Sequence, residues 1–123
     1  MSISKEIKQR LQKADKRFHS NDNISEFIKD GELDLLQKEV QEKMQEVLQS
    51  LCIDTENDHN TNETAKRVAK MWIRETFGGR YIPAPRVTSF PNMGYKSMYT
   101  SGPISIRSTC AHHFQNIVGK AWI

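Results

Sequence analysis

The sequence predicts an α+β fold, with helices in the N-terminal part and antiparallel strands in the C-terminal third. Apolar residues recur every three or four positions up to Phe77, two prolines then interrupt helix formation, and short alternating runs follow. At 123 residues the chain has the size of one modest domain. We divide it into a helical region, 1–62, and a region of one helix with the first strands, 63–123.

Residues 1–62 are predicted to contain two amphipathic helices and a short helical piece between them. The first eighteen residues form the first helix, with the apolar face Ile7, Leu11, Ala14 and Phe18. The short piece lies around Phe27, between polar residues 20–23 and the Asp30-Gly31 break. The strongest periodic segment runs from Leu33 to Leu51, and its stripe is Leu33, Leu36, Val40, Met44, Val47, Leu48 and Leu51.

A further helix is predicted over residues 63–77, with capping residues in 60–63 and a stop at Gly78-Gly79. One side of this helix is apolar. The other carries a cationic stripe of Arg67, Lys70 and Arg74, which no acid on the same face neutralises. A solvated charged face is the simpler interpretation of the stripe, and a site for an anionic ligand is the alternative.

Short strands are predicted after the glycines, because Pro83 and Pro85 exclude helix there. The strand signals lie at residues 87–89, near Met98, at 104–106 and at 117–123, with turn signals at 92–94 and 101–103. A strand with unpaired backbone groups needs a neighbour. We therefore expect a fragment, incomplete at the C-terminus, or a subunit that borrows strands.

Composition excludes several classes of function. The 18 basic and 15 acidic residues are interspersed, with a net charge of +3, so no block of charge predicts nucleic-acid binding, and a small phosphorylated ligand fits better. No apolar stretch predicts a membrane span or a signal peptide, and we expect a cytoplasmic protein. In a reducing compartment Cys52 and Cys110 are expected to be thiols.

Three potential metal ligands, Cys110, His112 and His113, follow the strand signal at 104–106. Sulfur with imidazole nitrogen favours zinc. Cys110 and His113 can share one ion only if the chain curls into a helix-like turn, which leaves His112 pointing elsewhere. A structural site needs two further protein ligands and a catalytic site needs one. The alternative is a buried, inert Cys110 beside two ordinary histidines.

The run Ile-Arg-Ser-Thr-Cys-Ala-His-His-Phe, residues 106–114, followed by Val-Gly-Lys-Ala at 118–121, resembles the zinc motif of the GTP cyclohydrolase I family. The usual form of that motif is Ser-x-Cys-Glu-His-His. The helix that begins at Glu63, with its Phe-Gly-Gly exit at 77–79, is similar to the family's helix before the sheet. The resemblance covers about residues 33–123.

This resemblance implies a tunnelling fold (T-fold), assembled as a homo-oligomer that is typically a decamer. The implied reaction is zinc-dependent hydrolysis of GTP to 7,8-dihydroneopterin triphosphate and formate, in tetrahydrofolate and one-carbon metabolism or deazapurine synthesis. By motif, Cys110 and His113 would be zinc ligands and His112 the general acid. Arg67 and Lys70 would contact the triphosphate across a subunit boundary.

Two departures from the family pattern leave an alternative open. Ala111 stands where the family usually has Glu, and the family's third zinc ligand and guanine-binding residues lie beyond Ile123. We expect the chain as written not to turn over alone. The alternative function is a non-catalytic or truncated family member that acts as an interaction or regulatory subunit. A zinc-stabilised nucleic-acid binder fits less well, because few aromatic residues accompany the basic ones.

Overall fold

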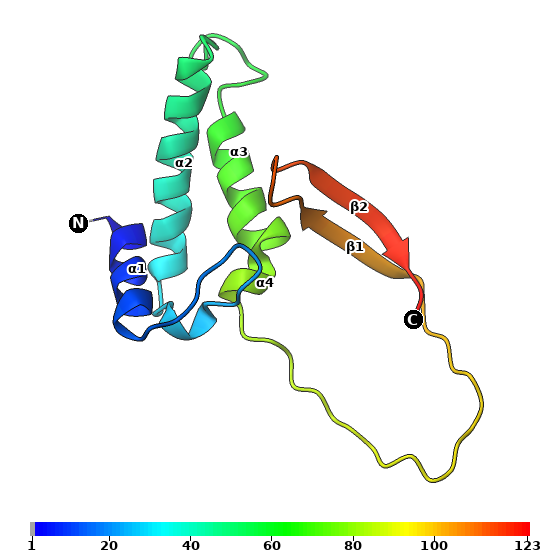
Figure 1. The fold of residues 1–123 in the computed structure, drawn as a ribbon. Helices are drawn as coiled ribbons and strands as arrows, with labels where there is room; N and C mark the ends of the chain where they lie inside the picture. The colour runs from blue at the N-terminus through cyan, green and yellow to red at the C-terminus, as the bar shows by residue number, and fades with distance from the viewer. Residues whose placement is uncertain (1) are drawn as a thin grey trace. The chain divides into compact units, whose positions relative to one another are not determined.

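The computed structural model describes residues 2–123, and the chain forms two compact units that divide between Pro83 and Ala84. The first unit is helical, and the second consists of an extended segment followed by a β-hairpin (Figure 1). Helices with a two-stranded antiparallel sheet confirm the α+β prediction. Within residues 2–123, every helix is too short or too polar to span a lipid bilayer.

The helical unit contains four α-helices, one 3₁₀ turn and one π turn. In chain order they are α1 (Ile3–Lys13), the 3₁₀ turn η1 (Ser25–Phe27), α2 (Glu32–Ser50), α3 (Thr64–Met71), the π turn η2 (Trp72–Thr76) and α4 (Gly78–Tyr81). Figure 1 shows α2 and α3 antiparallel and side by side, with α1 against the first turns of α2. The predictions of α2 and of a short turn around Phe27 are confirmed.

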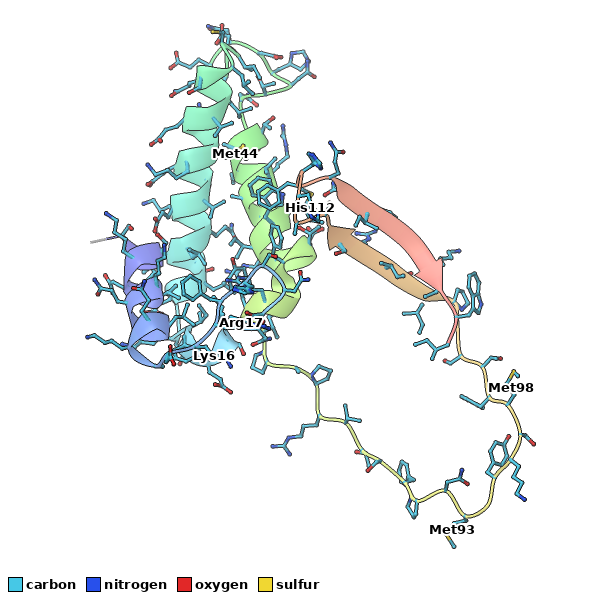
Figure 2. The ribbon with its side chains drawn as sticks, viewed as in Figure 1. Lys16, Arg17, Met44, Met93, Met98 and His112 are labelled. Carbon is cyan, nitrogen blue, oxygen red and sulfur yellow. The ribbon has the colours of Figure 1, made fainter. Side chains whose placement is uncertain are left out.

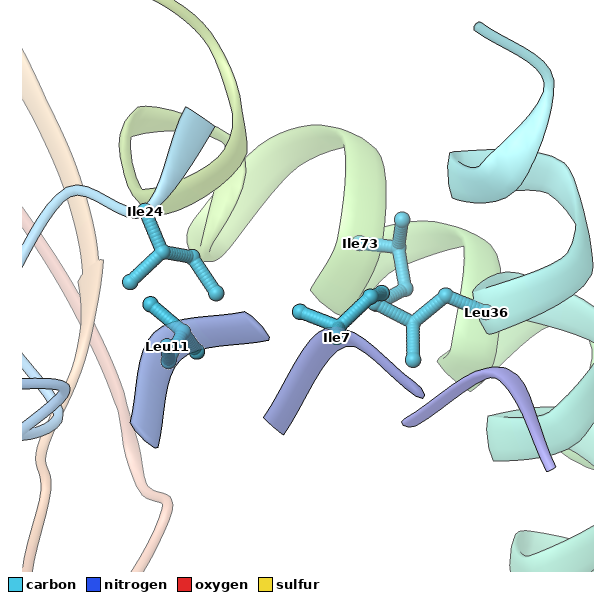
Figure 3. Close-up of a cluster of buried hydrophobic side chains, with 5 residues drawn as sticks. All are labelled: Ile7, Leu11, Ile24, Leu36 and Ile73. Atoms are coloured by element: carbon cyan, nitrogen blue, oxygen red, sulfur yellow. The ribbon is translucent and has the colours of Figure 1, made fainter. Parts of the chain in front are cut away.

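The core of this unit joins side chains from α1, α2, η2 and the loop before η1. Its buried members are Ile7, Leu11, Ile24, Leu36 and Ile73 (Figure 3). Burial of one such aliphatic side chain stabilises a fold by about 1.5–3 kcal/mol. The apolar faces predicted for α1 and α2 therefore meet in one cluster, which Phe18 and Val40 extend.

One partly buried ion pair fastens α1 to the start of α2. Arg10 donates to both carboxylate oxygens of Glu32, at 2.8 and 2.5 Å, and the backbone N–H of Lys29 also donates to Glu32, at 2.8 Å. The hydrogen bonds from Arg10, followed by the one from Lys29, hold the pKa of Glu32 below its ordinary value despite its burial. This charged contact fixes the position of α1 along α2.

The first helix ends earlier than the predicted eighteen residues. Asp15 adopts a left-handed conformation with φ 49°, and the N–H of Lys16 donates to the carbonyl of Leu11 at 2.9 Å. This six-to-one bond is a Schellman ending, in which Asp15 takes the place usually filled by glycine. The prediction was wrong because it relied on apolar spacing, and Phe18 packs on the core from outside the helix.

The helix predicted over 63–77 is also interrupted and extended. The N–H of Phe77 donates to the carbonyl of Trp72 at 2.9 Å, an i to i+5 bond that defines the π turn. Gly78 and Gly79 do not stop the helix, because neither adopts a positive φ and α4 forms through them. The predicted capping also fails, since Glu63 caps α3 without a side-chain hydrogen bond.

The second unit is an extended segment followed by a hairpin. Strands β1 (Ile104–Thr109) and β2 (Asn116–Ala121) pair antiparallel, with Ile104 opposite Ala121 and Thr109 opposite Asn116. Both strands were predicted, but those expected at residues 87–89 and near Met98 do not form. Those residues find no strand to pair with among the described residues, and Val87 and Met98 are each 90% exposed. The extended course past Met93 and Met98 is visible in Figure 2.

Candidate functional site

A tight turn between β1 and β2 carries the predicted metal ligands. The N–H of Phe114 donates to the carbonyl of Cys110 at 2.9 Å, and the N–H of Cys110 donates to the carbonyl of Gln115 at 2.8 Å. Phe114 closes the turn in the left-handed region, with φ 52°. The prediction that the chain curls here, instead of continuing as a strand, is confirmed. Figure 2 labels His112 at this turn.

The same turn sets the chemistry of the Cys110 sulfur. The backbone N–H of His112, and then that of His113, donate hydrogen bonds to Sγ and lower the pKa of the Cys110 thiol. Thiolate is the form of cysteine that binds metals. Cys110 is only half-buried, which leaves the sulfur accessible from solvent. The turn therefore presents a sulfur that ionises more readily than an ordinary thiol.

The two imidazoles of the turn are exposed, and one lies against the sulfur. His112 Nδ1 is 3.7 Å from Cys110 Sγ, within hydrogen-bond reach for sulfur. We expected His112 to point away from Cys110. The observed position places a ring nitrogen within hydrogen-bond reach of the thiol, and which of the two groups donates depends on the imidazole tautomer. Between Cys110 and the His113 ring, the described residues show no hydrogen bond.

Zinc fits this turn by ligand chemistry, while the number of ligands is incomplete. Sulfur and imidazole are the donor types that zinc prefers, and a catalytic site needs three such protein ligands. Within residues 2–123, no three His, Cys, Asp or Glu side chains come together in an arrangement able to hold a metal ion. Ala111 is exposed and provides no carboxylate. The turn can thus supply part of a zinc site.

The cationic stripe predicted on the helical unit lies on α3 and η2. Arg67 and Lys70 are both exposed, three residues apart on one face of α3. One Nη of Arg67 donates to the carbonyl of Asn60 at 2.9 Å, which steadies the guanidinium and leaves its other donors available. These two cations can bind an anion.

Arg74 does not share this freedom, which corrects the prediction of an unneutralised stripe. Its Nη2 pairs with Asp34 of α2, and its Nε donates to Gln37 at 3.1 Å. Periodicity within α3 could not show these partners, because they come from a different helix. Asp34 and Gln37 could therefore not be predicted from the sequence as partners of Arg74.

A second feature that the sequence analysis missed is Thr109, which directly precedes Cys110. Its hydroxyl is buried and has no hydrogen-bond partner among the described residues. Buried hydroxyls are usually paired. Its position beside the Cys-x-His-His run was the one signal in the sequence.

Comparison with known proteins places these motifs in one family. The sequence profile described as GTP cyclohydrolase I matches residues 40–123. GTP cyclohydrolase 1 of Serratia proteamaculans is 39% identical over 88 residues, which cover 70% of this chain and 39% of the relative. The protein of the same name from Yersinia enterocolitica is 40% identical over 86 residues, covering 68% and 39% respectively. The chain thus spans about two fifths of the length of these curated relatives.

Proposed function

Because the chain belongs to the GTP cyclohydrolase I family, we propose that it is part of a zinc-dependent enzyme that hydrolyses GTP to 7,8-dihydroneopterin triphosphate and formate. The observation that carries the proposal is the hairpin turn, whose backbone lowers the pKa of Cys110 beside two accessible imidazoles. We extend the proposal to a T-fold whose first strands are β1 and β2, in a catalytic region that starts at residue 63. The product would enter pterin and folate or deazapurine synthesis.

In this proposal Cys110 and His113 hold the zinc ion, as the family motif implies. When bound, zinc would supply Lewis acidity that activates water for attack on C8 of the purine. The thiolate-favouring turn supports the role of Cys110. His113 belongs to the same turn, and its exposed ring can reach an ion by side-chain rotation. Within residues 2–123, no third His, Cys, Asp or Glu side chain joins Cys110 and His113 in an arrangement able to hold a metal ion.

His112 is proposed to act as the general acid toward the purine ring. Imidazole is the side chain that gains and loses a proton near neutral pH, so it can deliver one to N7. The 3.7 Å between His112 Nδ1 and Cys110 Sγ supports this role, because it keeps the ring at the site. As the family motif implies, His112 would serve the chemistry without being required for metal binding.

Arg67 and Lys70 are proposed to bind the triphosphate of GTP. Their exposure and their shared face on α3 suit a polyanion, and a guanidinium can form two parallel bonds to one phosphate.

We propose a homo-oligomer, since the family motif contacts triphosphate across subunits. We do not propose nucleic acid or a membrane as a partner. We propose a cytoplasmic location, where the reducing environment would keep Cys52 and Cys110 as thiols.

The direct test incubates the protein with GTP and zinc and measures formate and pterin fluorescence together with bound metal. In a version of the protein that also carries the family's remaining site residues, we expect zinc to bind and the His112→Ala variant to retain it near the wild-type level while turnover is lost. Cys110→Ser should lose the metal. Loss of zinc in His112→Ala would show that the roles of the two histidines are exchanged, and wild-type protein that binds no zinc would refute the proposal.

A second candidate is a non-catalytic family member that acts as an interaction or regulatory subunit. The specific observation in its favour is Ala111, an exposed methyl group where the family motif has a carboxylate. Substitution of Ala111 by Glu distinguishes the candidates. A gain of turnover in that variant, from a wild type that binds zinc without forming product, would support the non-catalytic candidate.

A further inference from the structure

Of the three stripe cations Arg67, Lys70 and Arg74, the described residues 2–123 show an acid partner for Arg74 alone. Asp34 accepts from its Nη2, and Gln37 accepts from its Nε at 3.1 Å, so two side chains of α2 engage one guanidinium. Arg67 instead bonds a neutral backbone carbonyl. The three cations that share a stripe in the sequence therefore differ in the charge that remains available to a ligand.

The π turn contributes to this difference. A residue in a π turn advances around the helix axis by less than a residue in an α-helix, because the i to i+5 bond widens the turn. Ile73, in the same turn, stays buried in the core that includes Leu36 of α2. Arg74, the next residue, is held beside Asp34 and Gln37 on that helix. Arg74 is seven positions after Arg67, and in an unbroken α-helix that spacing would place the two residues on the same face.

The ion pair between Arg74 and Asp34 contributes little to the stability of the fold. Its main consequence is therefore electrostatic. The Asp34 side chain is 79% exposed and that of Arg74 is 36% exposed. Exposed pairs of this kind add little to stability. The pair nevertheless neutralises one cation next to a face that, in the proposed function, receives a polyphosphate.

We infer that Asp34 is a positioning residue that withholds Arg74 from a bound polyphosphate, so that the stripe of Arg67, Lys70 and Arg74 offers two cations instead of three. This inference rests on the proposed triphosphate role of Arg67 and Lys70. Asp34 acts through Arg74 and sets how strongly, and with what salt dependence, the face binds polyanions. Release of Arg74 from Asp34 would strengthen polyanion binding without the addition of another cationic residue.

The experiment titrates the 123-residue chain with inorganic triphosphate by calorimetry, at low and at moderate ionic strength. Asp34→Asn is expected to bind roughly threefold to tenfold tighter than wild type at low salt, the effect of one additional charge contact. Its affinity should also fall more steeply with salt, because one more charge is screened. The Arg74 Nε–H resonance should shift on addition of triphosphate in Asp34→Asn and stay in place in the wild type.

Matched control variants distinguish the release of Arg74 from a general effect of net charge or of folding on triphosphate binding. Glu26→Gln makes the same charge change at an exposed residue of η1 and should bind as wild type. Asp34→Glu keeps the acid and should also bind as wild type, whereas Asp34→Asn with Arg74→Gln should return to wild-type affinity.

Two outcomes overturn different parts of the account. If Asp34→Asn binds no tighter than Glu26→Gln while Arg67→Ala weakens binding, the inference fails and the proposed triphosphate face stands. If Arg67→Ala leaves binding unchanged, the triphosphate face itself is wrong, and the inference fails with it.

Discussion

Arg67 and Lys66 are adjacent residues of α3 with different surroundings. Lys66 pairs with Glu63 at 3.3 Å, whereas Arg67 bonds a backbone carbonyl and has no acid partner among the described residues. One charge-assisted hydrogen bond is worth about 1.5–3 kcal/mol, so Arg67→Ala should weaken triphosphate binding by roughly tenfold or more. Lys66→Ala removes the same charge and should have a small effect. Equal losses in calorimetric titrations of the two variants would return Arg67 to the solvated-face interpretation.

Gly31 and Gly79 allow a clean comparison of backbone conformation. A Cβ added to either would meet no atom within 4 Å, but Gly31 has φ +79° and Gly79 has no positive φ. Gly31→Ala should therefore lower the free energy of unfolding by about 1 kcal/mol through strain alone. Gly79→Ala should leave it unchanged or raise it by up to about 1 kcal/mol. Urea unfolding measures both, and equal values for the two variants would contradict the left-handed conformation at Gly31.

At the scale of elements, the Arg10 and Glu32 pair makes the attachment of α1 sensitive to pH. The native pKa of Glu32 lies below its ordinary value, chiefly through the hydrogen bonds from Arg10. The pair therefore contributes stability above about pH 4.3, the usual carboxyl value, and this contribution is lost as the pH falls through the lower native pKa. Glu32→Gln should cost about 1–3 kcal/mol at neutral pH and flatten the acid limb of the stability curve.

The control for this prediction is Glu46→Gln, which removes an exposed i,i+3 pair with Lys43. Exposed pairs of this kind contribute little, so its thermal midpoint should match that of the wild type. An unchanged acid limb in Glu32→Gln would show that the pair does not hold α1.

The sequence predicted the bounds of an element best where a single apolar stripe packs against a single core. The stripe of α2 predicted its bounds to within a residue, from Leu33–Leu51 to the observed Glu32–Ser50. Helix ends were less predictable, because Asp15 supplies a left-handed ending that is usually a glycine's. The strands expected at 87–89 and near Met98 failed since alternation shows a preference for strand, whereas a strand also requires a partner.

The candidate site, like the helices and strands, could be predicted from the sequence only in part. The need for a turn at Cys110–His113 followed from strand geometry, and the structure has that turn. The pairing of Arg74 with Asp34 could not be predicted, because it depends on how α2 packs against the following helix. The assignment of zinc to His113 instead of His112 stays a prediction, as does the boundary at residues 62 and 63.

At the scale of the whole molecule, residues 84–103 are the part of the chain most open to solvent. Val87, Phe90 and Met93 are each at least 84% exposed, and no helix or strand includes this segment. Trypsin should therefore cut first after Arg86 and Lys96, before any site in α2 or α3. Mass spectrometry of short digests identifies the cuts. Early cleavage within α2, with residues 84–103 intact, would show that this segment is covered, as a homo-oligomer would cover it.

The most direct test of the account is the absorption spectrum of the protein titrated with Co²⁺, a spectroscopic substitute for zinc. A sulfur-to-cobalt charge-transfer band should appear in the wild type and in His112→Ala, disappear in Cys110→Ser, and weaken strongly in His113→Ala. A band that survives in His113→Ala and disappears in His112→Ala would contradict the proposed ligand set. The absence of any band in the wild type would contradict a metal site at the hairpin turn altogether.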